Sequence, residues 1–263
     1  GCAFFLAYEN HWVLMGQSVA KERSWTPRHL LAYGTIYFVS SLAALLQGIQ
    51  TAAPPTKRTM TDEDLDTAME TFGEVFRVQE LNWPDEYAYA PLCAGRIAHT
   101  EESLIVDFRV SGLDLRVMNL SDKGRVWEDS ACEFFVQVPG CPEYFNFEVN
   151  PAGRLVASRG TGRAGREPLG DEAFGSIVRI SSVEGLPALT EPVEYKGGIW
   201  NWRVMLLIPF EVLGLDGAPA ALKGNIYKCG DLTAHPHFVT WAPVGTPAPD
   251  FHRPEFFGDF ILE

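Results

Sequence analysis

The sequence CEFFVQVPGCPEYFNFEVN (residues 132–150) contains two strand-like runs separated by turn residues. In the second run Phe145, Phe147 and Val149 alternate with one tyrosine, two asparagines and a glutamate. Alternation with a period of two places successive side chains on opposite faces of a strand. The Pro-Gly dipeptide between the runs favours a turn. This stretch therefore predicts half-buried antiparallel strands.

Outward from this stretch, similar short runs divided by Gly and Pro recur along the chain, at residues 104–110, 154–158, 176–180, 199–208, 224–229, 237–241 and 257–262. Thr61, followed by three acidic residues, predicts a short helix that reaches Phe72. Helices do not alternate with these strands, so a parallel α/β sheet is not expected. The sequence predicts an all-β domain at residues 58–263, an antiparallel β-sandwich of jelly-roll type.

Composition narrows the class of protein further. The 263 residues include 34 Asp and Glu against 21 Lys and Arg, which gives a formal net charge of −13 at pH 7. Apolar residues make up 46% of the chain and charged residues 21%, which excludes an intrinsically disordered protein. Binding to nucleic acid needs clustered Lys and Arg to neutralise phosphates, and the sequence has no such cluster. We therefore expect a folded protein with no nucleic-acid partner.

Residues 1–57 differ from the rest and are predicted to form a separate N-terminal leader. Residues 30–49 (LLAYGTIYFVSSLAALLQGI) lack charged side chains and match the roughly 20 residues that cross a bilayer. Lys21, Arg23 and Arg28 precede this run, as in a signal or anchor segment. On this interpretation the body is extracytoplasmic, and residues 30–49 anchor it or direct its export. A buried helix of the body, or a leader foreign to the domain, are the alternatives.

The cysteines Cys2, Cys93, Cys132, Cys141 and Cys229 show no C-x-x-C spacing, which disfavours a zinc ribbon or a thioredoxin-like site. Cys132 lies in an apolar strand pattern and is expected to be a small core residue. The sequence leaves open whether one disulfide forms, for example between Cys132 and Cys141.

Residues 126–135 (VWEDSACEFF) carry the first group of candidate binding residues. Trp127 lies at the entrance of a strand, where its ring could stack on the apolar face of a sugar. Alternation places Glu133 opposite Cys132 and Phe134, and its carboxylate could accept two hydrogen bonds from sugar hydroxyls. The alternative is a core tryptophan beside surface acids.

Two further segments carry side chains suited to the same chemistry. Residues 150–154 (NPAGR) form a predicted hairpin turn, in which Arg154 offers a planar set of donors. Spacing alone favours a surface ion pair between Arg154 and Glu148, a contact worth little. Asn150 lies on the polar face of its strand and is a further candidate. Trp241 ends a predicted strand before a proline-rich loop and could form a second aromatic wall.

At these segments the sequence resembles the family 9 carbohydrate-binding modules, and more closely a family-9-like group of single-domain bacterial proteins. The matching strings are VWEDSACEFFV (126–136), YFNFEVNPAGRL (144–155), WNWRVMLLIPFEVLGL (200–215), and the segment from NIYKCGDLTAHPHFVTWAP to FHRPEFFG (225–258). They agree with the family in order and spacing, and they are spread over much of the predicted body.

This resemblance implies a β-sandwich that binds sugars without cleaving them. In such modules two tryptophans clamp a sugar at the reducing end of a glycan, and a glutamate and an arginine bind its hydroxyls. Carried over to this chain, Trp127 and Trp241 would be the walls, Glu133 the carboxylate and Arg154 the guanidinium. The resemblance also implies a mono- or oligosaccharide ligand from plant-type glycans such as xylan, no required cofactor and a structural calcium ion. Because no catalytic domain is recognised in the sequence, the identity of the sugar stays open.

Other interpretations of the same residues remain open. Glu133 and Glu148 could be the paired carboxylates of a glycoside hydrolase, although nothing in the sequence sets their separation. A related sandwich could instead contact another protein or bind haem, with Met118 and the C-terminal histidines as the first ligands to test. His235 and His237 would share a strand face, as two metal ligands can, but an intervening proline and the lack of a third ligand disfavour zinc.

Overall fold

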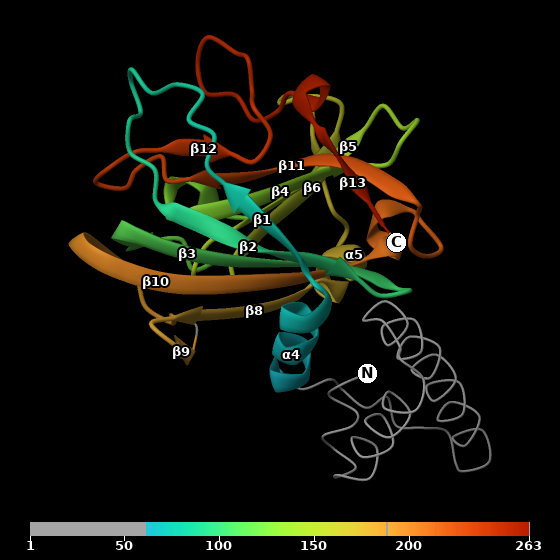
Figure 1. The fold of residues 1–263 in the computed structure, drawn as a ribbon, viewed down its shortest axis with the longest axis horizontal. Helices are drawn as coiled ribbons and strands as arrows, with labels where there is room; N and C mark the ends of the chain where they lie inside the picture. The colour runs from blue at the N-terminus through green and yellow to red at the C-terminus, as the bar shows by residue number, and fades with distance from the viewer. Residues whose placement is uncertain (1–61, 188, 263) are drawn as a thin grey trace, which may run out of the picture. The chain divides into compact units, whose positions relative to one another are not determined.

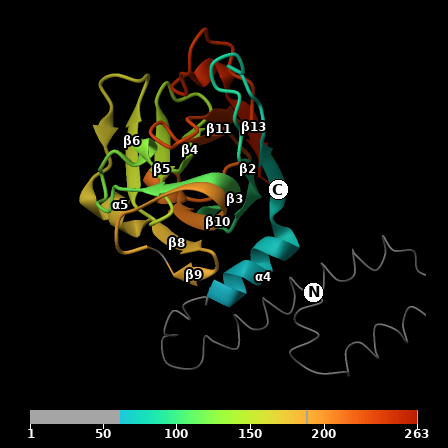
Figure 2. The same cartoon turned by 90° about the vertical axis from the view of Figure 1, so that its left-hand side faces the viewer.

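The computed structural model of the protein describes residues 62–187 and 189–262, which form a two-layer antiparallel β-sandwich (Figure 1, Figure 2). The predicted fold class is confirmed. The predicted leader of residues 1–57, with its anchor segment and its boundary to the body, lies outside the described residues. In the part of the chain that the structure describes, no helix is long and apolar enough to cross a membrane.

The first sheet has six antiparallel strands in the order β1-β2-β3-β10-β8-β9. Their bounds are Glu74–Val78 (β1), Leu92–His99 (β2), Ser103–Val117 (β3), Val193–Pro209 (β10), Val178–Val183 (β8) and Leu186–Pro187 (β9). Helix α4 (Asp62–Phe72) lies against the outer face of this sheet (Figure 1). Leu65 and Met69, one turn apart on α4, pack against Ile105 and Met205 of the sheet. This apolar pair holds the predicted helix in place.

The second sheet has the order β12-β11-β4-β5-β6-β7, and β13 also pairs with β11. Its strands are Phe238–Thr240 (β12), Ala221–Cys229 (β11), Ala131–Gln137 (β4), Tyr144–Val149 (β5), Leu155–Gly160 (β6), Glu167–Pro168 (β7) and Gly258–Ile261 (β13). The short helices are η1 (Val126–Glu128), α5 (Asp171–Ser176), η2 (Phe210–Leu213) and η3 (Pro254–Phe256). Strands β4 and β5 lie at the centre of this sheet, so residues 132–150 form its middle.

The hydrophobic core lies between the two sheets. From β4 and β5 it takes alternate residues, among them Phe134, Phe147 and Val149, which are fully buried. From the first sheet it takes residues such as Phe108 and Leu206. Each such side chain contributes about 1.5–3 kcal/mol when it leaves water. The alternation predicted for residues 144–150 is therefore confirmed as an alternation between the core and the outer face.

Several elements differ from the sequence prediction. Strand β2 was not predicted, because Gly95 and its small neighbours give it no alternating pattern. Gly95 is required there by close packing, since a Cβ at this position would collide with the carbonyl of Asp107. The helix α5 ends at Ser176, so β8 begins two residues later than predicted. The four described cysteines are free, and no disulfide joins Cys132 to Cys141.

Two loops cover the outer face of the second sheet, which the sequence analysis had treated as a polar face. They are residues 79–91 and 242–257, and they contribute apolar side chains to a second hydrophobic cluster around Phe135 and Tyr227. The Nε1 atom of Trp83 donates to the carbonyl of Thr246 at 2.7 Å, and the amide of Val244 donates to Asn82 at 2.9 Å. Because the loops bind to each other, they form a fixed cover over β4, β5 and β11.

Candidate functional site

A pocket of about 330 Å³ lies between this cover and the outer face of the second sheet. Strands β4, β5, β6 and β11 form its floor. Residues from η1, the segment between β6 and β7, the end of β11, β12 and loop 242–257 form its walls. The lining residues are Trp127, Glu133, Asn146, Glu148, Val156, Ser158, Arg163, Arg166, Cys229, Asp231, Phe238, Pro249, Phe251 and His252. The volume is at the small end of the range for ligand pockets, which suits a ligand of one or a few rings.

Glu133 and Glu148 lie side by side on the floor. They are directly paired in the register of β4 and β5, and each is more than nine-tenths buried, with 4% and 6% of the surface exposed. Directly opposed residues on neighbouring strands have Cβ atoms only about 4.5–5.5 Å apart. The sandwich therefore holds two carboxyl groups together at the base of the pocket.

Each of these carboxyl groups has hydrogen-bonding capacity to spare. Glu133 accepts from the thiol of Cys229 at 3.1 Å, and Glu148 accepts from the amide of Asn146 at 2.7 Å. The structure describes no hydrogen bond to the second oxygen of either group. Of the buried side-chain nitrogens and oxygens in the described residues, one alone lacks a partner, and it belongs to Arg154. The free carboxyl oxygens are thus accessible to the pocket and can accept bonds from a ligand.

Burial and proximity shift the protonation of this pair. Burial raises the pKa of Glu148 from 4.5 to about 7, although its hydrogen bond from Asn146 acts in the opposite direction. Burial raises the pKa of Glu133 well above its ordinary value, and the neighbouring charge of Glu148 adds to the rise. Two carboxylates this close resist simultaneous ionisation. Near neutral pH the pair therefore keeps a proton, and it can donate as well as accept hydrogen bonds.

A chain of polar contacts holds the floor in shape. The side-chain oxygen of Asn146 accepts from Ser158 at 2.6 Å and from Arg166 at 2.9 Å, which leaves its nitrogen to donate to Glu148. Arg166 also donates to three backbone carbonyls and lies 4.3 Å from the ring centre of Tyr144. Since every nitrogen of Arg166 already donates, this residue positions its neighbours rather than waiting for a ligand.

The walls combine aromatic rings with a few polar groups. Trp127 and Phe238 are partly exposed and line the pocket. Trp127 comes from η1, before β4, and Phe238 comes from β12. Burial raises the pKa of Asp231 to about 6 and lowers that of His252 to about 3. His252 is consequently neutral at physiological pH. Its Nδ1 atom lies 2.9 Å from the hydroxyl of Tyr144.

Asn150, predicted to bind a ligand, instead supports the backbone. Its amide nitrogen donates to the carbonyl of Asn119 and to Asp129, and its oxygen accepts from the backbone of Ala152 and Arg154. The side chain is fully buried and does not line the pocket. Its polar strand position therefore closes a turn, because all its donors and acceptors are used within the protein.

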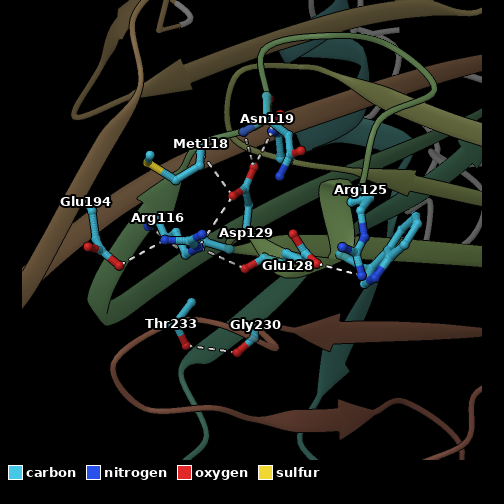
Figure 3. Close-up of polar contacts among 12 residues, drawn as sticks. Arg116, Met118, Asn119, Arg125, Glu128, Asp129, Glu194, Gly230 and Thr233 are labelled. Atoms are coloured by element: carbon cyan, nitrogen blue, oxygen red, sulfur yellow. Dashed lines mark hydrogen bonds and ion pairs between the residues drawn. The ribbon is translucent and has the colours of Figure 1, made fainter.

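Asp129 is the centre of this supporting cluster. It is fully buried and accepts from the backbone amides of Met118 and Asn119, each at 2.9 Å, as Figure 3 shows. Arg116 lies 3.7 Å from the same carboxylate. The cluster fixes η1 against the end of β3, and it thereby sets the position of Trp127.

Arg154 lies beside the pocket without lining it. It is two residues before Val156, which lines the floor, so alternation places both on the same face of the sheet. Its Nε atom is buried without a hydrogen-bond partner in the described residues. The predicted ion pair with Glu148 does not form there. Arg154 therefore keeps a donor that no protein group among the described residues satisfies.

Trp241 occupies a different place from the one predicted. Its ring stacks on Phe260 at 5.0 Å between ring centres, and a Cβ at Gly258 would lie 2.5 Å from it. Both contacts come from the end of the chain, where β13 returns to β11. The structure does not bring Trp241 to the pocket that Trp127 lines.

The residues considered for metal or haem are already engaged. His237 is buried, and its ring lies 2.8 Å from the Nζ atom of Lys228 and 2.8 Å from the carbonyl of His235. His235 lies 2.8 Å from Asp114. Within the described ranges, no group of three or more His, Cys, Asp and Glu side chains could hold a metal ion. The calcium ion that the resemblance implied stays a prediction.

Two parts of the site were missed in the sequence. Arg163 and Arg166 come from the glycine-rich segment between β6 and β7, and Arg163 forms an ion pair with Asp250 of the covering loop at 2.9 Å. Phe238 comes from β12 and Phe251 from loop 242–257, and neither was singled out in the sequence. For the polar floor of the pocket, the available signal in the sequence was the alternation of Ser158 with Ala157. It placed a second polar residue opposite Asn146.

Comparisons with known proteins agree with this architecture. The profile of carbohydrate-binding family 9 matches residues 61–262. A candidate carbohydrate-binding protein from Bacteroides uniformis ATCC 8492 is 33% identical, with a TM-score of 0.72, and the match covers 80% of this chain and 95% of that one. A family 9 module from Caldicellulosiruptor kristjanssonii, solved with glucose, is 12% identical, with a TM-score of 0.46 and coverages of 81% and 92%. A comparison with curated proteins found no match.

Proposed function

Because the chain belongs to carbohydrate-binding family 9, we propose that its β-sandwich binds a mono- or oligosaccharide, without cleaving it, in the pocket lined by Trp127, Glu133 and Glu148. The observation that carries the proposal is the pair of buried glutamates with accessible, unpaired oxygens. Sugar hydroxyls donate hydrogen bonds, and bonds to ionised acceptors are about twice as strong as those between neutral groups. A ligand that satisfies both oxygens therefore recovers part of the cost of burying these carboxyl groups.

The proposed walls are Trp127 and Phe238. Both rings are partly exposed and line the pocket, and aromatic rings offer large rigid surface for the apolar face of a sugar. The tryptophan and the glutamate implied by the family resemblance, Trp127 and Glu133, thus belong to one site. In this proposal a phenylalanine takes the place that the sequence analysis gave to Trp241.

Arg154 extends the proposed site on the side of Val156. Its Nε atom is unpaired among the described residues, and an arginine presents several donors in one plane. A second sugar unit, or the hydroxyls of the first, would supply the missing acceptors. Arg154→Ala is expected to weaken binding and to leave the fold unchanged.

The proposal is tested by calorimetric titration of the full chain with glucose, xylose and their short oligomers. A shallow site of this size is expected to give dissociation constants between about 10 µM and 1 mM. Glu133→Gln and Glu148→Gln should each weaken binding about tenfold. Glu101→Gln, which changes an exposed glutamate in the turn before β3, is the matched control and should have no effect. Equal binding by all four proteins would contradict the proposed site.

One observation favours a second candidate function, glycoside hydrolysis. Glu133 and Glu148 are directly paired, and the pKa of Glu148 is about 7, as a general acid requires. Incubation of the protein with xylan and cellulose, followed by an assay for new reducing ends, separates the two functions. Hydrolysis that Glu148→Gln abolishes would favour the enzyme, and binding without new ends would favour the non-catalytic module.

The location of the protein, the source of its sugar ligand and its calcium ion stay predictions. An extracytoplasmic location and a membrane anchor depend on residues 30–49, which lie outside the described residues. The plant-type glycan, xylan in particular, and the calcium ion rest on the family resemblance alone.

A further inference from the structure

Titratable side chains of both signs line the pocket. The carboxyl groups of Glu133, Glu148 and Asp231 face two arginines and a histidine, and His252 is neutral because burial and the arginines lower its pKa to about 3. A neutral thiol, that of Cys229, completes the titratable lining. Whether a cation pairs directly with the floor carboxyls therefore depends on what the two arginines already bind.

Both arginines are committed to protein groups. Arg166 donates from all three of its nitrogens, to Asn146, Ser158 and backbone carbonyls. Arg163 directs its Nε and Nη2 atoms to Asp250 at 3.2 and 2.9 Å. Neither arginine is recorded within hydrogen-bond distance of Glu133 or Glu148. Both arginines act on Glu148 through space and lower its pKa, but in the described part of the chain neither floor carboxyl forms a direct ion pair.

A buried carboxyl pair without a cation is unfavourable when ionised. In the empty pocket the pair relieves this cost by keeping a proton. A ligand that brings its own positive charge relieves it in another way, since the bonds that it donates would be charge-assisted on both sides. The geometry leaves an accessible acceptor oxygen on each glutamate for such a group.

This inference rests on the proposed sugar-binding function and deepens it. We infer that the pocket selects a sugar bearing a protonated amine, such as a 2-amino-2-deoxyhexose, over neutral sugars, and that it excludes sugar acids. The ammonium group donates to the free oxygens of Glu133 and Glu148, while the ring lies between Trp127 and Phe238. A uronic acid would place a third carboxylate beside two others, which is a repulsive arrangement in a buried site.

The test compares four ligands of related shape on the full chain by calorimetric titration at pH 6.5. The ligands are glucosamine, glucose, N-acetylglucosamine and glucuronate. We expect glucosamine to bind at least about tenfold more tightly than glucose, because one charge-assisted bond replaces a neutral one. N-acetylglucosamine, whose amine is uncharged, should lose that advantage, and glucuronate should not bind measurably.

The preference should depend on the floor carboxyls. Glu148→Gln keeps the shape of the side chain and should reduce the advantage of glucosamine over glucose to less than about threefold. Glu101→Gln should leave it unchanged. Titration of the unmodified protein in two buffers of different ionisation enthalpy gives a readout that needs no variant, because binding of the ammonium group should release protons from the pair.

The outcomes separate the inference from the function on which it rests. If glucose binds as tightly as glucosamine, the inference is overturned and sugar binding stands. If glucosamine is preferred but the preference survives in Glu148→Gln and no protons are released, the inference is overturned as well. If the folded protein binds none of the four ligands, sugar binding in this pocket fails, and the inference fails with it.

Discussion

Asp129 and the pair Glu133–Glu148 are buried carboxyl groups in or next to the second sheet, but their hydrogen-bond environments differ. Asp129 accepts three hydrogen bonds within 3 Å, from Met118, Asn119 and Asn150, and an arginine lies nearby. Each of the two glutamates accepts one bond from a neutral group, among the residues that the structure describes.

This difference separates support from binding. A buried carboxylate whose acceptor capacity is filled by backbone amides holds a loop in place, and a ligand has nothing to offer it. A buried carboxyl with a free oxygen facing a pocket costs stability, and a ligand can recover that cost. In this sandwich the supporting carboxylate positions Trp127, and the unfilled pair lies where a sugar would lie against that ring.

The largest expected effect is on stability and comes from replacing Asp129, the supporting carboxylate. Asp129→Ala leaves two buried backbone amides and one donor of the Asn150 side chain without their acceptor. We expect the free energy of unfolding to fall by about 3 kcal/mol or more. Urea unfolding measures this change. A loss below about 1 kcal/mol would show that Asp129 does not support the fold, and the contrast with the glutamates would collapse.

The pH dependence of stability tests the protonation of the glutamate pair, Glu133 and Glu148. The unfolded state loses the Glu148 proton near pH 4.5, but the folded state keeps it until about pH 7. Between these values the folded state keeps the Glu148 proton, so the contribution of Glu148 to stability falls as the pH rises and levels off above about pH 7. The pKa of His252, lowered to about 3, acts in the opposite direction up to about pH 6.5. From Glu148 this loss is about 3 kcal/mol, and Glu133 acts in the same direction.

Glu148→Gln removes this contribution and leaves that of His252, so the difference in unfolding free energy between the two proteins should change between pH 4.5 and 7. The measurement is the free energy of urea unfolding at several pH values for both proteins. A difference that stays constant over this range would mean that the pKa of Glu148 is not raised in the folded state, contrary to the structure.

Two tryptophan variants compare a ring that lines the pocket, Trp127, with a ring that packs on Phe260, Trp241. Trp127→Ala should weaken sugar binding about tenfold and change stability little, because the ring is partly exposed at the pocket. Trp241→Ala should leave the affinity unchanged and lower the free energy of unfolding by about 2 kcal/mol, because its ring packs on Phe260. Titration and urea unfolding of both variants give the four values. The reverse result would restore Trp241 as the second wall.

The smallest expected effect concerns the ion pair between Arg163 and Asp250. Both side chains are substantially exposed, so Arg163→Gln should change stability by less than about 1 kcal/mol. Sugar affinity should change by no more than about twofold, since Arg163 contacts a loop and not the floor carboxyls. A large loss of affinity would show that the arginine contacts the ligand directly.

The sequence could predict the sandwich because the alternation of residues 144–150 is a local property of the strand. The resemblance brought Trp127 and Glu133 forward, and both line the pocket. The places of Trp241 and Asn150 could not be derived, because they depend on β13 and on Asp129, which contact them across the fold. The burial of Glu148 likewise depends on loop 242–257 and on the segment between β6 and β7, whose positions no local pattern encodes.

The central claim is that a sugar fills the open acceptors of Glu133 and Glu148. A crystal structure of the protein with bound glucosamine or glucose tests it most directly. We predict a sugar ring against Trp127, with donors within about 3 Å of the second oxygen of each glutamate. A sugar bound elsewhere, for example against Trp241 or on the outer face of the first sheet with this pocket empty, would contradict the account.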